Sequence, residues 1–202
     1  MIKKILLTLM AIIGVILIAA SFQSDDMNVS RSATINAAPE AVYKVVSDFR
    51  QWDAWSPWSK LDPEMKKSID IKPEGVGSVY KWSGNSEVGE GSTTLVEAKP
   101  NEKVGMRLEF VRPMEGSSDV QFTFVPEAAG TKVTWSMQSK KPFIGKVAGL
   151  FMDCEKMCGD QFSEGLNNLA KVVASAPAPA VASEIPPVPA PPGPATPATA
   201  NP

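Results

Sequence analysis

The segment 143–173 constrains the fold of this chain most, because its apolar residues recur at the spacing of a long amphipathic helix. Gaps of mostly three and four residues place them on one face of a 3.6-residue repeat over about eight turns. The apolar positions are Phe143, Val147, Leu150, Phe151, Cys154, Cys158, Phe162, Leu166, Leu169 and Val173. A helix of this length that follows a one-sided sheet most simply covers its apolar face. If side chains do not fill the space between helix and sheet, we expect the function to lie there.

Seven segments before this helix have the composition or alternation of β-strands: 29–35, 68–72, 79–83, 87–98, 104–110, 120–124 and 133–137. In the last three, apolar and polar residues alternate, as in an antiparallel sheet with one wet and one buried face. Their buried row should contain Met106, Leu108, Phe110, Phe122, Phe124, Trp135 and Met137. Pro39 opens a short helix after the first strand, and Pro57 limits a second one near Trp52. We therefore predict an α+β helix-grip fold, with a seven-stranded antiparallel curved sheet wrapped around the long C-terminal helix and two short helices after the first strand.

The N-terminus carries a segment suited to a membrane. Lys3 and Lys4 precede 18 uncharged residues, 5–22, and a helix of that length is roughly 27 Å long, close to the hydrocarbon thickness of a bilayer. A cleaved signal peptide is the alternative, with Ala19 and Ser21 as small residues at the cut. Because the run exceeds the ~7–15 residues of the apolar core of a signal peptide, we favour an anchor over residues 1–24. Both interpretations leave Lys3 and Lys4 in the cytoplasm and the domain on the outer, periplasmic or extracytoplasmic side.

The C-terminal segment 176–202 contains ten prolines, eight alanines and a single charge, Glu184. Proline lacks the amide proton and fixes φ, so helix and sheet do not propagate through such a segment. We predict a disordered tail with polyproline character. A proline-reading partner is the alternative, and no flanking charge or repeated register identifies one.

Composition excludes several classes of function. Lys and Arg total 20 and Asp and Glu total 22, without the basic stripe of a nucleic-acid-binding protein. The chain has no histidine, which removes Ser-His-Asp and Cys-His nucleophiles and His-ligated zinc, and we expect neither a metal nor a cofactor. Cys154 and Cys158 lie one helical turn apart on the expected inward face. They are interpreted as buried apolar residues, with a redox-labile pair as the alternative.

Several short motifs occur in an order seen in a known superfamily: 35–43 (INAAPEAVY), 52–58 (WDAWSPW), 89–91 (GEG), 100–103 (PNEK), 130–135 (GTKVTW) and 151–153 (FMD). In this order the chain resembles the START-like SRPBCC superfamily, in particular its polyketide cyclase/dehydrase-like branch, over residues 29–174. The resemblance implies the helix-grip fold. It leaves the activity open, because the superfamily includes lipid carriers, hormone receptors and cyclases.

An apolar cavity in this fold would be lined by the inner row and by aromatic residues at its ends. The candidate ligand-binding residues are Trp55, Trp58, Trp82, Met106, Phe110, Phe122, Phe124, Trp135, Met137 and Phe151. The tryptophans near Pro57 either form the mouth of the cavity or plug it, and methionines and phenylalanines between a sheet and a helix also form ordinary core. Candidate carboxylates for catalysis are Asp48, Asp53, Glu90, Glu97 and Asp153. Of these Asp153, beside the inward face of the helix, is the best single candidate.

Three functional hypotheses follow. The leading one is a non-enzymatic, membrane-tethered extracytoplasmic domain that binds a lipid or another apolar small molecule in an internal cavity. The second is a cyclase- or dehydratase-like enzyme that uses a buried carboxylate and bound water on a polyketide-like substrate. The third is a packed structural or partner-binding module without a ligand.

Overall fold

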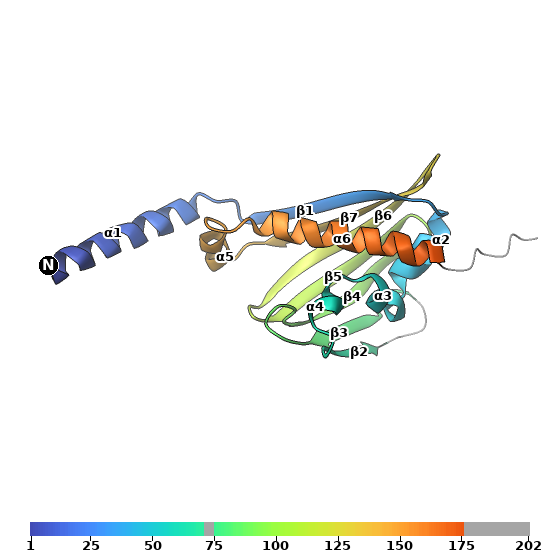
Figure 1. Ribbon diagram of the computed structural model, residues 1–202, viewed down its shortest axis with the longest axis horizontal. Coiled ribbons are helices and arrows are strands. Elements are labelled where there is room, and N and C mark those ends of the chain that lie inside the picture. Colours follow the sequence, from blue (N-terminus) through green and yellow to red (C-terminus); the bar gives the residue numbers. More distant parts are fainter. Residues whose placement is uncertain (71–74, 176–202) are drawn as a thin grey trace, which may run out of the picture.

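The computed structural model describes residues 1–70 and 75–175 and confirms the helix-grip architecture (Figure 1). Its strands are β1 (Asp26–Ile35), β2 (Lys66–Asp70), β3 (Val79–Ser83), β4 (Glu90–Lys99), β5 (Lys103–Arg112), β6 (Gly116–Glu127) and β7 (Gly130–Lys140). Its helices are α1 (Ile2–Ser21), α2 (Pro39–Ser47), the 3-10 helix η1 (Phe49–Gln51), α3 (Trp52–Trp55), α4 (Trp58–Leu61), α5 (Phe143–Ala148) and α6 (Cys154–Ser175). The strands form one antiparallel sheet in the order β1-β7-β6-β5-β4-β3-β2.

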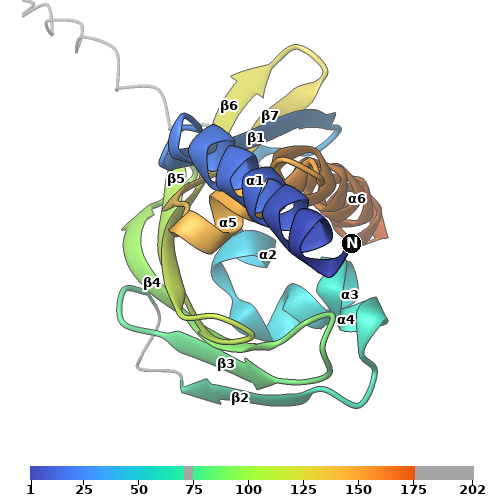
Figure 2. The same ribbon diagram turned by 90° about the vertical axis from the view of Figure 1, so that its left-hand side faces the viewer.

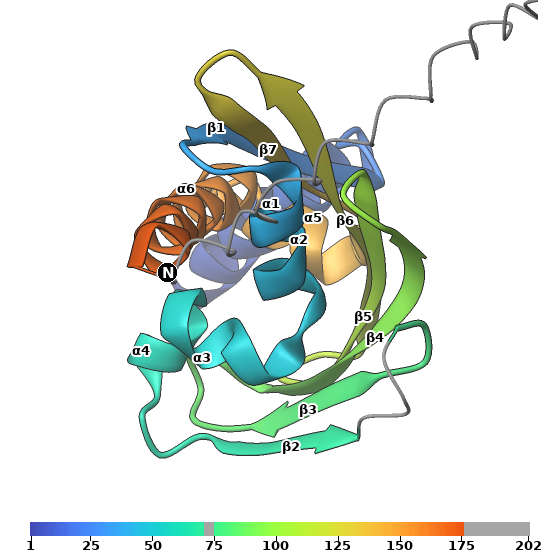
Figure 3. The same cartoon turned by 90° about the vertical axis from the view of Figure 1, so that its right-hand side faces the viewer.

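The sheet is strongly curved, and α2 and α6 lie on its concave side (Figures 2 and 3). The period-2 alternation places one row of each strand on this side, and the 3.6-residue period places one stripe of α6 against it. Phe162, Leu166, Leu169 and Val173 of α6 are buried, as are Met106, Phe122, Phe124, Trp135 and Met137 of the predicted inner row. Leu108 and Phe110 are half-buried because they lie toward the end of β5 where the concave face opens.

The bounds of β3 agree with the prediction, whereas β1, β5, β6 and β7 extend beyond their predicted segments and the bounds of β2 and β4 are shifted. β4 begins at Glu90 rather than at residue 87, because the Asn85 side chain accepts hydrogen bonds from the backbone N–H groups of Glu87 and Val88 and holds this stretch in the turn. β2 covers Lys66–Asp70, and the predicted strand positions Ile71 and Lys72 lie outside the described residues. The predicted tail, 176–202, also lies outside them.

The single helix predicted over 143–173 was wrong: the chain forms α5 and α6 with a break between them. α5 ends at Ala148, with Gly149 as its C-cap. The Asp153 carboxylate accepts a hydrogen bond from the backbone N–H of Lys156 at 2.8 Å, which caps the start of α6. The apolar spacing continues across the break although the backbone does not. Phe143 and Phe151, predicted to face the sheet, are 49% and 71% exposed.

Helix α1 extends from the domain at the end that carries α5 (Figure 1). Among the described residues it is the one helix long and apolar enough to cross a membrane, as either an anchor or a signal sequence would be. Ala20, in its last turn, is fully buried, whereas the rest of α1 is largely exposed. The last turn of α1 therefore lies against the domain, next to α5.

Candidate functional site

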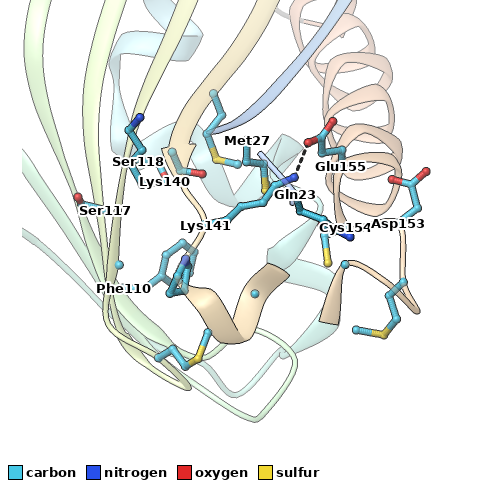
Figure 4. Close-up of a pocket in the computed structure, with 18 of the residues that line it drawn as sticks. Gln23, Met27, Phe110, Ser117, Ser118, Lys140, Lys141, Asp153, Cys154 and Glu155 are labelled. Atoms are coloured by element: carbon cyan, nitrogen blue, oxygen red, sulfur yellow. Dashed lines mark hydrogen bonds and ion pairs between the residues drawn. The ribbon is translucent and has the colours of Figure 1, made fainter. Parts of the chain in front are cut away.

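A pocket of about 640 Å³ opens at the end of the concave face, between the sheet, α5 and the start of α6 (Figure 4). It is lined by Gln23, Met27, Phe110, Met114, Glu115, Gly116, Ser117, Ser118, Met137, Ser139, Lys140, Lys141, Pro142, Gly145, Gly149, Leu150, Phe151, Met152, Asp153, Cys154 and Glu155. These residues come from the segment between α1 and β1, from four strands, and from the region around the helix break.

The pocket exists because the inward row of the sheet changes from large to small side chains. At its centre this row contains Met137 of β7 and Val120 of β6, which are paired across the sheet. Two residues further along each strand, at the next position on the same face, the paired residues are Ser139 and Ser118. Gly116 is the next position on this face of β6. Side chains this small do not reach the helix layer, and the volume they leave forms the pocket.

The wall of the pocket is mostly apolar and rich in methionine. Its large apolar side chains are Met27, Phe110, Met114, Met137, Leu150, Phe151 and Met152. The unbranched, polarizable thioether of methionine adapts to ligands of irregular shape. This wall is therefore suited to a flexible hydrocarbon chain or ring system.

The pocket lining also contains polar groups. Lys141 Nζ lies 2.9 Å from Glu155 Oε1 (Figure 4), and the side chain of Lys141 is only 19% exposed. Lys140, also in the lining, pairs with Asp26. Serine hydroxyls and these paired charges give an amphipathic ligand polar groups beside the apolar wall.

Three of the ligand-binding candidates from the sequence line this pocket, Phe110, Met137 and Phe151, and so does the catalytic candidate Asp153. Met27 and Ser118 were missed from the sequence, although each lies two residues before a residue in a predicted strand, Val29 and Val120, and therefore on the same face of the strand. Gln23 of the α1–β1 connection and Lys141 after β7 were also missed, because they carry no periodic signal.

Most of the other candidates pack against one another under the middle of α6. The ring of Trp135 stacks on Phe162 with centroids 4.2 Å apart and lies 4.7 Å from Phe122. Trp55 and Trp58 approach the Trp135 ring at 5.6 and 5.7 Å. These contacts make Trp55 and Trp58 a plug for this part of the fold, and Met106 and Phe124 are also buried in the core.

Trp82 lies elsewhere, on β3, where its ring contacts Tyr80 and Phe110. Its indole N–H donates to the carbonyl of Val88 at 3.0 Å. Trp82 also lines a second, shallower pocket of about 390 Å³ beside Lys66 and Lys81. A ligand role for Trp82 and for the core aromatics stays a prediction.

Two indole N–H groups in this aromatic centre, those of Trp55 and Trp135, are buried without an acceptor among the described residues. A buried donor without an acceptor costs about 1–3 kcal/mol. A water molecule or a ligand oxygen that reached these groups would recover that free energy.

The candidate carboxylates all have structural partners. Asp153 caps α6, as described above. The others pair with basic side chains at 2.7–2.8 Å: Asp48 with Arg50, Asp53 with Lys67, Glu90 with Arg112 and Glu97 with Lys103. Partial burial raises the pKa of Asp48, but hydrogen bonds from Arg50 outweigh this effect and hold the pKa below its usual value. Among residues 1–70 and 75–175, no group of three His, Cys, Asp or Glu side chains could hold a metal ion.

Cys154 and Cys158 are free thiols and both are half-buried. Burial raises the pKa of Cys158 to about 11, although the nearby Arg31 guanidinium opposes the rise. The Cys158 thiol is therefore protonated at neutral pH and is a poor nucleophile.

A curved antiparallel sheet around a long C-terminal helix, with a pocket at one end, defines a helix-grip protein. A sequence profile of the family described as "Polyketide cyclase / dehydrase and lipid transport" matches residues 26–174. The chain therefore belongs to this family. Comparison with curated protein sequences finds no match.

Solved structures share the fold at low sequence identity. A protein from Chromobacterium violaceum is 16% identical, with a TM-score of 0.53 over 74% of this chain and 96% of its own. The di-domain ARO/CYC StfQ from the steffimycin biosynthetic pathway is 12% identical, with a TM-score of 0.55 over 74% of this chain and 50% of its own. Ara h 8.0201 is 14% identical, with a TM-score of 0.52 over 75% of this chain and 99% of its own.

Proposed function

We propose that this chain is a membrane-tethered protein that binds a lipid or another apolar small molecule in the pocket between the sheet, α5 and α6. The observation that carries the proposal is the pocket itself, about 640 Å³ with a methionine-rich wall. Sites for small molecules are clefts of about 300–1,000 Å³ with mostly apolar walls and a few polar groups. The family description, which includes lipid transport, supports the same conclusion.

The pocket favours binding over carboxylate catalysis. Its two best-placed carboxylates, Glu155 and Asp153, accept hydrogen bonds from Lys141 Nζ and from the backbone of Lys156. A general acid or base needs a pKa near the working pH and access to the substrate proton. These carboxylates instead hold the pocket together, so we do not propose a reaction.

The tether is the N-terminal helix. α1 has 20 residues and a mean hydropathy of 2.4 over its most apolar stretch. Lys3 and Lys4 at its start favour the cytoplasmic side for the N-terminus, which leaves the domain on the outer side of the membrane. The ligand would then be a molecule of the outer leaflet or of the space beyond it.

Photo-crosslinking tests the pocket directly. The full chain is incubated in membranes with a fatty acid that carries a diazirine on its acyl chain, irradiated and digested, and the modified peptides are identified by mass spectrometry. We expect adducts on strand residues that line the pocket, namely Phe110 and Met137.

A matched pair of variants provides the control. Ser118→Phe fills the pocket from β6, where Ser118 is 6% exposed, and it should abolish the adducts on Phe110 and Met137. Ser30→Phe makes the same change at an exposed position on β1 and should leave them intact. Equal labelling of both variants, or adducts confined to α1, would refute binding in this pocket.

A further inference from the structure

We propose that α5 and the turn 149–153 form a membrane-docking surface that rests on the bilayer spanned by α1, so that the pocket opens toward the lipid. The inference deepens the proposed function, on which it rests for the ligand, because it gives an apolar ligand a route that avoids water. The partner is the lipid surface itself, and the docking surface is defined by Phe143, Ile144, Phe151 and Met152.

Large apolar side chains are exposed on this surface. Ile144 is 61% exposed, and Phe143, Phe151 and Met152 are each about half exposed or more. Phe151 and Met152 also line the pocket, so the docking surface continues into the apolar wall. Contiguous exposed apolar residues at the mouth of a pocket are typical of a surface that contacts a membrane or another protein.

The geometry of α1 identifies the membrane as the partner. α1 ends at Ser21 and β1 begins at Asp26, and a connection of four residues spans at most about 14 Å. The connection is also fixed at both ends. Ala20 is fully buried, and the backbone N–H of Lys141 donates to the carbonyl of Asp25 at 2.6 Å. The domain therefore cannot move far from the bilayer surface.

α5 is the element held next to the end of α1. Lys146 of α5 pairs with Asp25, and a Cβ built on Gly149 would lie 3.0 Å from Gln23 Oε1. The last turn of α1 lies where an apolar span meets the headgroups, so α5 lies at the same depth. Figure 1 shows α1 and α5 together at one end of the domain, with the tip of the β6–β7 hairpin at the other.

The charges around the docking surface predict that its contact with lipid is apolar. Its three lysines are each paired with a carboxylate: Lys140 with Asp26, Lys141 with Glu155 and Lys146 with Asp25. The paired charges cancel, so anionic lipid gains little attraction. Docking should therefore be equally strong on zwitterionic and anionic bilayers.

Site-specific photo-crosslinking to lipid tests the proposal on the full chain. Benzoylphenylalanine replaces one residue at a time, and the chain is reconstituted into vesicles of phosphatidylcholine alone or mixed with phosphatidylglycerol. Phe143 and Ile144 do not line the pocket and report contact of the docking surface with lipid. Phe110 lines the pocket and reports lipid inside it. Val125, 51% exposed in the β6–β7 hairpin at the other end of the domain, is the control. Intact mass confirms that residues 1–24 are present.

We expect at least a tenfold higher yield of lipid adduct at Phe143 and Ile144 than at Val125, in both vesicle types. Ile144→Asp, an exposed change, should lower the yield at Phe143 to the Val125 level while leaving the melting temperature unchanged. Adduct at Phe143 and Ile144 no greater than at Val125, or adduct only in anionic vesicles, would overturn the docking surface. Adduct at Phe110 without adduct at Phe143 would refute membrane docking but support ligand binding in the pocket. Adduct at Phe143 without adduct at Phe110 would support membrane docking but refute ligand binding in the pocket.

Discussion

Replacing Gly165 by alanine distinguishes a filled interior from an internal cavity under α6. A Cβ built on Gly165 would lie 2.7 Å from Cζ3 of Trp135 and 3.2 Å from Cδ of Pro57, whereas carbon atoms pack best at about 3.5–4.0 Å. The Trp135 ring has little room to yield, because it stacks on Phe162 at 4.2 Å and contacts Phe122 at 4.7 Å. The added methyl group should therefore overpack the core.

Two effects of opposite sign decide how much Gly165→Ala changes the free energy of unfolding. Alanine is favoured over glycine in a helix by about 1 kcal/mol, and overpacking a close-packed core costs about 1–3 kcal/mol. With the cost taken near the middle of its range, Gly165→Ala should lower the free energy of unfolding by about 1 kcal/mol. In a protein of this size that lowers the melting temperature by about 2–4 °C.

Gly159→Ala is the matched control in the same helix. The three atoms nearest to a Cβ built on Gly159 all belong to the guanidinium of Arg31, the far end of a flexible side chain that can move aside. The helix-propensity gain then dominates, and the melting temperature should rise by about 2–4 °C. Both changes are measured by intrinsic tryptophan fluorescence during heating, in one detergent. If Gly165→Ala raises the melting temperature as Gly159→Ala does, the interior is not filled, and a central cavity replaces the end pocket as the binding site.

Two further predictions concern the start of α6 and the thiol of Cys158. Asp153→Ala should lower the free energy of unfolding by about 1 kcal/mol because it removes the helix cap. Asp153→Asn keeps a hydrogen-bond acceptor and should lower the free energy of unfolding much less. Chemical denaturation measures both changes, and equal losses for the two variants would contradict the capping role. Because burial raises the pKa of Cys158 to about 11, its thiolate fraction near pH 8 falls by about a hundredfold. Iodoacetamide should therefore modify Cys158 far more slowly in the folded chain than in urea, and the rate in the folded chain should increase as the pH rises toward 11. Mass spectrometry of the modified peptide measures these rates. Equal rates in the folded chain and in urea would exclude the pKa shift.

The sequence alone determined the approximate position of each strand and of the long C-terminal helix, and which face of the central strands and of α6 is buried. The alternation around Phe122 and Trp135 and the helical period through Phe162 and Leu166 are properties of the local backbone. They predict burial without knowledge of the partner. The order of the family motifs matched the order of these elements, so the helix-grip fold class was predictable, whereas the break between α5 and α6 was not.

Tertiary structure decided where the free volume lies. The sequence pattern marked Trp135 and Met106 as equally good for lining a cavity or filling a core, because packing density depends on side-chain volumes from segments far apart in the chain. Only in three dimensions do Trp55, Phe122 and Phe162 close around Trp135, while the small Ser118 and Ser139 open the pocket. The exposure of Ile144 was likewise unpredictable, because it follows from the break before Asp153 and from the contact of α5 with α1. Local periodicity determines faces, and long-range packing determines which of those faces remain open.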